Sequence, residues 1–281
     1  MADEFKKSDL EILVATMNRS SLDFLIPMFP FAHFSQFSIL VINQTTAENL
    51  IVSDYENVRV INSYEKGLSK SRNLALKNTA GKVALIADDD VVFLSCFDSK
   101  ILEAHQRNAD YSIICFQTLT SENRPYISYR KEQFWMKEKD FRDVLSIELT
   151  FKPEDLQKKN IIFNEYFGLG AKFQDAESLF FLRRANYNQL KVLFCPENIV
   201  IHEAFSSSDD VASDRLIYAK MAGFYKRYSS GAYFFLIKFI FFLIRKGYIS
   251  SKEVTPKFKT GLKGIQDYKK LLKSKLENKY D

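Results

Sequence analysis

Three consecutive aspartates, Asp88, Asp89 and Asp90, are the strongest sign of chemistry in this sequence. They follow an apolar run, 83–87, that has the pattern of a buried strand. Adjacent carboxylates repel one another, and crowding them is costly unless a cation neutralises them. Ligands bind at the carboxyl edge of open parallel sheets, and hard divalent cations prefer oxygen ligands. The triplet therefore predicts a metal site more readily than a solvated acidic turn.

A second candidate precedes the triplet, in the stretch Lys66-Gly67-Leu68-Ser69-Lys70-Ser71-Arg72-Asn73. Gly67 permits a tight turn, and a helix that begins after it presents free backbone N–H groups. A helix N-terminus of this kind binds anions, and Lys66 and Arg72 add positive charge. We expect this stretch to hold a diphosphate, although many helices begin in the same way.

A single histidine, His202, closes a short apolar strand at 198–201. A lone histidine in such a place is usually structural. As a further ligand to a metal held by Asp90, it would instead complete a mixed oxygen and nitrogen site, which suits Mn²⁺ or Mg²⁺. The serines at 206–208 could bind phosphate oxygens or cap a helix.

A loop with two glycines and two acids forms the fourth candidate, between residues 165 and 179. Its glycines predict a mobile or tightly turned loop. Asp175 and Glu177 follow at the start of a helix whose apolar face begins at Leu179. Carboxylates there are stabilised by the helix dipole, which is a structural role. The functional alternative is a general base that faces an acceptor hydroxyl.

Short apolar runs rich in β-branched residues must position these groups. Five of them indicate buried strands: 11–16, 37–42, 58–61, 82–87 and 111–116. A helix that Ser69 or Ser71 could cap, and that Gly81 follows, separates the third strand from the fourth. Continuous apolar strands that alternate with helices predict an α/β fold, with a mostly parallel central sheet flanked by helices.

Composition excludes several classes of protein. The chain has 281 residues, of which 46% are apolar and 27% charged, as in ordinary globular proteins. Three widely spaced cysteines form neither a disulfide framework nor a zinc motif. The polar N-terminus has no signal-peptide pattern, which predicts a cytoplasmic location. The net charge of +5 comes from the region after residue 244, so a nucleic-acid-binding surface over the whole protein is not indicated.

The C-terminal region differs from the rest in composition. Its first part, 231–244, is apolar except for Lys238. A spanning helix needs about 20 apolar residues, so this segment indicates either an interfacial helix or a helix of a protein core. The basic tail that follows favours an anionic membrane surface. We therefore expect two domains, 1–225 as the α/β domain and 226–281 as a helical, basic, membrane-associated tail.

The order of these parts resembles the family 2 glycosyltransferases, which have the Rossmann-like GT-A fold. The resemblance spans roughly residues 10–210, and five stretches carry it in sequence: Thr16-Met17-Asn18-Arg19 after the first strand, the helix entry 67–73, the turn 87–90, the loop 167–172 and His202. It implies an inverting, metal-dependent transfer of a sugar from a nucleotide-diphosphate sugar, most often a UDP-sugar. The aspartate triplet resembles the family's DXD motif.

The resemblance also assigns roles. A Mn²⁺ or Mg²⁺ ion would be held by Asp90 and His202. The donor would be bound by Thr16, Arg19, Asn43, Lys66, Arg72, Asp88 and Asp89, with the first three around the nucleotide base. The family's acidic pair before a helix is commonly Glu-Asp, where this chain has Asp175-Ala176-Glu177. Glu177 matches the second acid and is expected to be the base, with Asp175 as the other candidate.

The expected partners are a nucleotide-diphosphate sugar, a glycan or lipid-linked glycan acceptor, and an anionic membrane surface, with no nucleic acid. The protein would work at the inner face of the membrane. Two alternatives stay open. A sugar-phosphate nucleotidyltransferase usually carries a glycine-rich loop after its first strand, where this chain has residues 16–20 without glycine. A catalytically silent GT-A-like binding module would be consistent with the departure at Ala176.

Overall fold

The computed structural model describes residues 4–203 and 211–278. These residues form two compact units. The first unit contains residues 4–163 and 178–203, and the second contains residues 164–177 and 211–278. The sequence-based domain boundary, between residues 225 and 226, falls inside a helix of the second unit. The composition changes there, but that helix packs with the apolar and basic helices that follow it.

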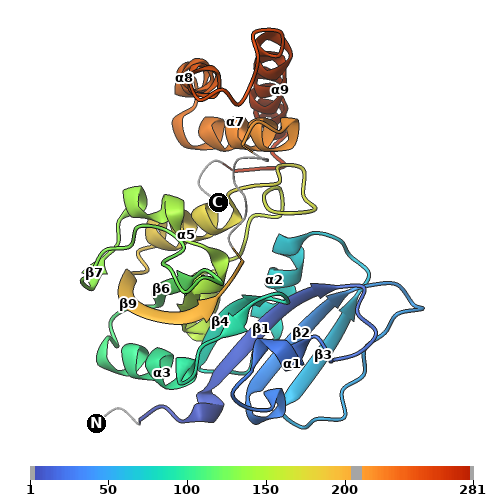
Figure 1. Cartoon of the computed structure of the whole chain (residues 1–281), viewed down its shortest axis with the longest axis vertical. Coiled ribbons are helices and arrows are strands. Elements are labelled where there is room, and N and C mark those ends of the chain that lie inside the picture. Colours follow the sequence, from blue (N-terminus) through green and yellow to red (C-terminus); the bar gives the residue numbers. More distant parts are fainter. Residues whose placement is uncertain (1–3, 204–210, 279–281) are drawn as a thin grey trace. The chain divides into compact units, whose positions relative to one another are not determined.

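A mixed sheet forms the centre of the first unit (Figure 1). Within residues 4–203 its strands are β1 (Leu10–Met17), β2 (Ser38–Gln44), β3 (Val58–Ser63), β4 (Val83–Asp88), β5 (Val92–Phe93), β6 (Ile113–Leu119), β7 (Phe134–Trp135), β8 (Leu149–Phe151) and β9 (Val192–Ile201). They lie in the order β3-β2-β1-β4-β8-β6-β9-β5, and β7 also pairs with β9. Neighbours from β3 to β4 are parallel, as are β6 and β9, whereas β5, β7 and β8 run antiparallel. The five predicted strands and the α/β class are confirmed.

Helices cover both faces of this sheet because successive side chains of its strands point to opposite sides. In β1, Ile12 and Val14 belong to one apolar core and Leu13 to the other. The first core includes α1 (Leu25–Met28) and α3 (Phe97–Arg107). The second includes α2 (Leu68–Asn78), α4 (Pro153–Lys158) and α5 (Glu177–Tyr187). Short 3-10 turns complete the unit: Lys7–Asp9, Phe34–Gln36, Glu138–Asp143 and Ser146–Glu148.

The start of α2 differs from the sequence-based expectation. The helix begins at Leu68, and Gly67 is its N-cap with φ 126°, a conformation that favours glycine. Ser69 and Ser71 are buried inside the helix and do not cap it. The glycine therefore sets where the helix begins, since a residue with a side chain would be strained at that φ.

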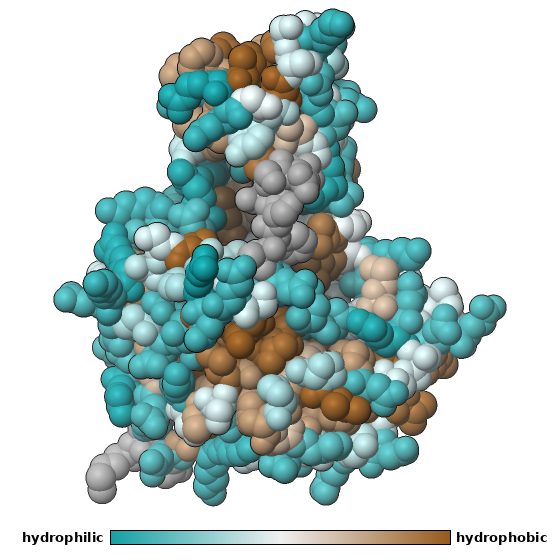
Figure 2. Space-filling view, in the orientation of Figure 1, coloured by the Kyte–Doolittle hydropathy of each residue, from teal (hydrophilic) through white to brown (hydrophobic). Residues whose placement is uncertain are grey.

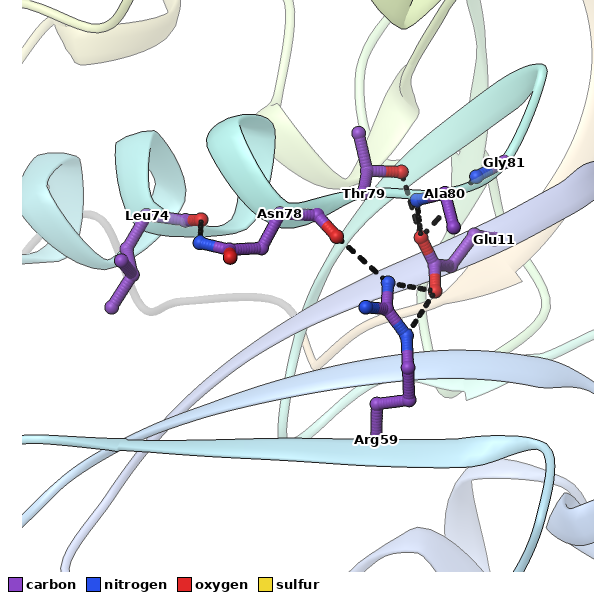
Figure 3. A network of polar contacts seen from close by, with 7 residues as sticks. All are labelled: Glu11, Arg59, Leu74, Asn78, Thr79, Ala80 and Gly81. Atoms are coloured by element: carbon purple, nitrogen blue, oxygen red, sulfur yellow. Dashed lines mark hydrogen bonds and ion pairs between the residues drawn. The ribbon is translucent and has the colours of Figure 1, made fainter.

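A buried carboxylate stabilises the sheet at the edge opposite the aspartate triplet (Figure 3). Glu11 in β1 is 1% exposed, and one of its carboxylate oxygens accepts hydrogen bonds from Nη2 (2.7 Å) and Nε (3.3 Å) of Arg59 in β3. The other oxygen accepts from the Thr79 hydroxyl (2.7 Å) and the Ala80 amide (2.7 Å) after α2. One side chain thus joins β1, β3 and the segment that leads from α2 into β4.

Replacing Glu11 with alanine is expected to destabilise the protein by about 2–3 kcal/mol, because it leaves Arg59, Thr79 and the Ala80 amide without their shared acceptor. Denaturant unfolding of the two proteins measures this difference. Glu103→Ala is the matched control, because Glu103 forms an exposed ion pair with Arg107 and should cost no more than about 0.5 kcal/mol. Equal midpoints for both variants would contradict a structural role for Glu11.

Three helices form most of the second unit: α7 (Asp214–Tyr228), α8 (Gly231–Arg245) and α9 (Val254–Lys273). Two glycines of α9 allow close packing, since a Cβ on Gly264 would lie 2.2 Å from the Tyr218 carbonyl oxygen and one on Gly261 would lie 2.4 Å from Leu236 Cδ1. The apolar run predicted as either a core helix or an interfacial helix is α8. No helix in the described part of the chain is long and apolar enough to cross a membrane.

Candidate active site

The carboxyl ends of three parallel strands bring the predicted donor-site residues together. In the sheet register, Thr16 of β1 lies opposite Asn43 of β2, and Ala15 lies opposite Asp88 at the end of β4. Asp89 and Asp90 follow directly in the turn after β4. The strands therefore place the aspartate triplet beside the end of β1, at the edge where ligands bind in open α/β sheets.

Each carboxylate of the triplet has its own partner. Arg72 Nη2 donates to Asp88 Oδ1 at 3.0 Å. Asp89 Oδ2 accepts hydrogen bonds from the Thr16 hydroxyl at 2.5 Å and from Nε and Nη2 of Arg19 at 3.0 and 2.8 Å. Asp90 Oδ1 lies 3.5 Å from His202 Nε2. Two guanidinium groups thus neutralise two of the carboxylates, and the third faces an imidazole.

Strand pairing explains why Asp90 and His202 meet, although they are far apart in the sequence. Val92 of β5 lies opposite Ile201 at the end of β9, so the residues just outside this short pairing also face each other. The Asp90 side chain is 63% exposed and that of His202 is 11% exposed. The hydrogen bond between them holds the pKa of the Asp90 carboxyl below its usual value and raises the pKa of the His202 imidazole.

This pair has the chemistry of a partial metal site. A carboxylate oxygen and an imidazole nitrogen are ligands that Mn²⁺ accepts, and the exposed carboxylate leaves room for ligands from a substrate. Among the described residues, no group of three or more His, Cys, Asp or Glu side chains is arranged to hold a metal. Asp90 and His202 fit a cation whose other ligands come from a bound substrate or water. The serines at 206–208 lie outside the described residues.

Two of the predicted donor-binding side chains are buried. Arg72 is 1% exposed, and its Nη2 also donates to Ser146 Oγ at 2.7 Å. The Asn43 side chain is fully buried and bonds the backbone N–H and C=O of Arg19 at 3.2 and 3.0 Å. Arg72 therefore positions Asp88, and Asn43 positions the Arg19 backbone, while their contacts with a donor stay a prediction. Lys66 is exposed beside the start of α2.

Sequence reasoning missed several residues that shape this edge. The Gln44 side chain bonds both the N–H and the C=O of Gly67, at 2.9 and 3.0 Å, and so fixes the turn before α2. The Tyr129 hydroxyl donates to the buried Glu148 carboxyl and accepts from the Thr118 amide at 3.1 Å. Burial raises the pKa of Glu148 to about 7. No motif marks these residues, because their partners are distant in the sequence.

The two acids proposed as general bases belong to the second unit. Glu177 is the first residue of α5, and Asp175 precedes it by two positions. Ala176 between them has φ 66°, a left-handed conformation that costs energy in a residue with a Cβ. Burial raises the pKa of the Asp175 carboxyl, against a smaller opposing effect of Lys220. A raised pKa brings a carboxylate closer to the range in which a general base works at neutral pH.

The loop before these acids is held by the helices of its own unit. Phe173 stacks on Tyr218 of α7 with ring centroids 5.3 Å apart, and Arg215 Nη1 donates to the Gln174 carbonyl at 2.9 Å. At the start of the loop, Asn164 Nδ2 donates to Glu277 Oε1 at 2.8 Å. The same oxygen accepts from the buried Lys226 ammonium at 2.5 Å. The helical unit thus positions the acidic loop, a role beyond the tail expected from the sequence.

Comparison with known proteins gives one family match and several similar solved structures. Residues 33–168 match the family model described as Glycosyl transferase family 2. The crystal structure of S. aureus TarS 1-349 matches with 13% identity and a TM-score of 0.52, over 94% of this chain and 91% of that one. The same fragment in complex with UDP-GlcNAc matches with 12% identity and a TM-score of 0.52, over the same shares of the two chains. A comparison with curated proteins gives no match.

At this level of identity the TarS structures show a shared fold, and the family model accounts for β2 to β8 and the aspartate triplet between them. The chain therefore has an α/β fold similar to that of TarS, and its residues 33–168 are similar to the family 2 glycosyltransferases.

Proposed function

We propose that this protein is a glycosyltransferase that moves a sugar from a UDP-sugar to a hydroxyl of a glycan or lipid-linked glycan, with a divalent cation and with inversion at C1. One observation carries the proposal. Of the three carboxylates at the sheet edge, Asp90 is the most exposed, at 63% against 31% for Asp88 and 24% for Asp89, and His202 lies beside it. UDP is the favoured nucleotide because a TarS structure contains UDP-GlcNAc.

Asp90 and His202 would hold the cation. When bound, Mn²⁺ or Mg²⁺ supplies positive charge for the diphosphate, on which negative charge develops as it leaves. Arg72 fixes the carboxylate of Asp88, and Thr16 and Arg19 fix that of Asp89. These contacts keep the turn after β4 in one conformation, so that Asp90 does not have to be ordered when substrate binds.

The remaining residues bind the donor and accept a proton. The exposed guanidinium of Arg19 and the ammonium of Lys66 can contact an anionic donor, and the start of α2 offers backbone N–H groups. Glu177 takes the proton of the acceptor hydroxyl, whose oxygen bonds to C1 while the bond from C1 to the diphosphate breaks. A single displacement of this kind inverts the anomeric centre and releases UDP.

The proposal includes the inner face of a membrane as the place of reaction. The charge balance supports it: from Arg245 to the end, eleven Lys or Arg stand against four Asp or Glu. Basic residues near an anionic surface contribute about 1 kcal/mol each. An enzyme held there would meet lipid-linked acceptors in two dimensions.

A donor screen tests the reaction class. The full chain is incubated with UDP-, GDP- and dTDP-sugars after removal of metal with EDTA, with and without added Mn²⁺ or Mg²⁺. We expect metal-stimulated release of the nucleoside diphosphate, strongest with a UDP-sugar. Release of pyrophosphate from a sugar phosphate and a nucleoside triphosphate would identify a nucleotidyltransferase. No metal-stimulated loss of any donor would favour a catalytically silent binding module.

A further inference from the structure

Helix α8 has two apolar faces, and the other described residues of its unit cover one of them. The covered face consists of buried core residues: Ala232, Leu236, Ile240 and Leu243. Phe234 and Phe241 lie on the opposite face and are 62% and 63% exposed, although both are large and apolar. The fold does not need this second face for its core, and soluble proteins rarely expose contiguous apolar surface without a use for it.

The exposed residues form a continuous stripe, which we call the outer face of α8. It consists of Phe234, Ile237, Phe241 and Ile244. Their spacing of three and four residues places them on one side of the helix. Hydrophobic atoms are visible at the surface in the region of α8 (Figure 2). Figure 1 locates the helix beside α7 and α9 of the same unit.

The charges around this stripe are positive. The Lys238 ammonium lies 5.6 Å from the centroid of the Phe234 ring, so this cation stands beside the outer face. Arg245 is the last residue of α8, and the helix contains no acidic residue. Helix α9, which packs against the covered face of α8 at Leu236, adds six lysines to the same unit with a single acid, Asp267. Any partner of this surface therefore has to combine an apolar interior with a negatively charged boundary.

We propose that the outer face of α8 docks on an anionic lipid bilayer, with the helix lying in the plane of the interface. Phe234 and Phe241 enter the boundary between headgroups and acyl chains, while Lys238 and Arg245 extend toward lipid phosphates. A helix of 15 residues is about 22 Å long, which is short of the roughly 30 Å of a bilayer core. The length fits this orientation.

A second copy of the chain fits the surface less well. Two outer faces packed together would press the Lys238 ammonium of each copy against apolar rings of the other and bring like charges together. Lipid imposes neither cost, because a lysine at the interface keeps its ammonium in water beside phosphate. The docking surface specifies how the protein would bind the membrane that the proposed function includes. Membrane binding itself does not require that function, but its benefit to catalysis rests on it.

Vesicle sedimentation of the full chain tests this proposal. We expect binding to vesicles of phosphatidylcholine mixed with phosphatidylglycerol, weaker binding to phosphatidylcholine alone, and loss of the difference at high salt. The double variant Phe234→Gln, Phe241→Gln should lower the partition coefficient at least about tenfold, and Lys238→Glu should lower it about tenfold on anionic vesicles only. Tyr187→Gln is the control, because Tyr187 is an exposed aromatic of the first unit.

Two results would overturn the docking surface. One is equal vesicle binding by the double variant and the wild type, when thermal unfolding shows that both proteins are folded. The other is a wild-type dimer in solution that the double variant dissociates, which would assign the surface to a second copy. Sugar transfer to a water-soluble acceptor is measured in parallel and should not change in the variants. Vesicle binding without any sugar transfer would contradict the proposed function but would still support the docking surface.

Discussion

Replacing Asp90 with alanine is expected to remove metal-stimulated sugar transfer, with a fall of about 10³-fold in kcat/KM. Asp90 is the exposed carboxylate of the triplet, and His202 beside it cannot bind a divalent cation tightly alone. The first measurement is release of nucleoside diphosphate as a function of Mn²⁺ concentration. The second is thermal unfolding, because a ligand at 100 times its Kd stabilises a protein by about 2.7 kcal/mol.

The second measurement separates loss of the metal from loss of the fold. Wild-type protein should unfold at a higher temperature with Mn²⁺ and UDP than without them, and Asp90→Ala should lose this increase while keeping its own metal-free midpoint. His202→Ala should weaken metal dependence less, and the double variant should add little to Asp90→Ala because both side chains act on one ion. An Asp90→Ala enzyme with unchanged Mn²⁺ dependence would place the cation elsewhere.

The long apolar strands could be predicted from the sequence, whereas the short antiparallel ones could not. β1, β2, β3, β4 and β6 are strands of six or more residues, and all but β3 are mostly buried, so their apolar runs are visible in the sequence. β5 and β7 contain two residues each and β8 contains three. Segments of that length carry no periodicity, so only the pairing partners around them determine that they are strands. This matters for the site, because β5 is the strand that brings Asp90 to His202.

In the candidate site too, patterns of adjacent residues could be predicted from the sequence, whereas contacts between residues far apart in the sequence could not. The triplet and its position after a strand were readable, because three adjacent carboxylates are a local pattern. Crowded carboxylates need positive charge beside them, and Arg19 and Arg72 supply it to two of the three. The metal ion at the third stays a prediction. The sequence predicts Arg72 as a ligand for diphosphate because it follows a glycine at a helix start. In the structure it is buried, and one of the residues that it contacts, Ser146, is 74 residues away.

Replacing Glu177 with glutamine is expected to lower kcat by about 10²–10⁴ while the KM for the donor changes little. Glutamine has the size of glutamate but cannot accept the proton of the acceptor hydroxyl. The lost interaction with the dipole of α5 is worth about 0.3–1 kcal/mol, too little to unfold the protein. Single-turnover transfer with saturating donor and acceptor measures the chemical step. Glu154→Gln is the control, because Glu154 also lies in the first turn of a helix, α4, and should leave kcat unchanged.

Asp175→Asn is the comparison that decides between the two acids. Burial raises the pKa of Asp175, which favours it as a base. If Glu177 is the base, Asp175→Asn should reduce kcat far less than Glu177→Gln. A large loss of kcat in Asp175→Asn, with near-normal transfer by Glu177→Gln, would identify Asp175 as the general base. Large, non-additive losses for both would mean that the carboxylates act as one unit, with Asp175 setting the basicity of Glu177 through their repulsion.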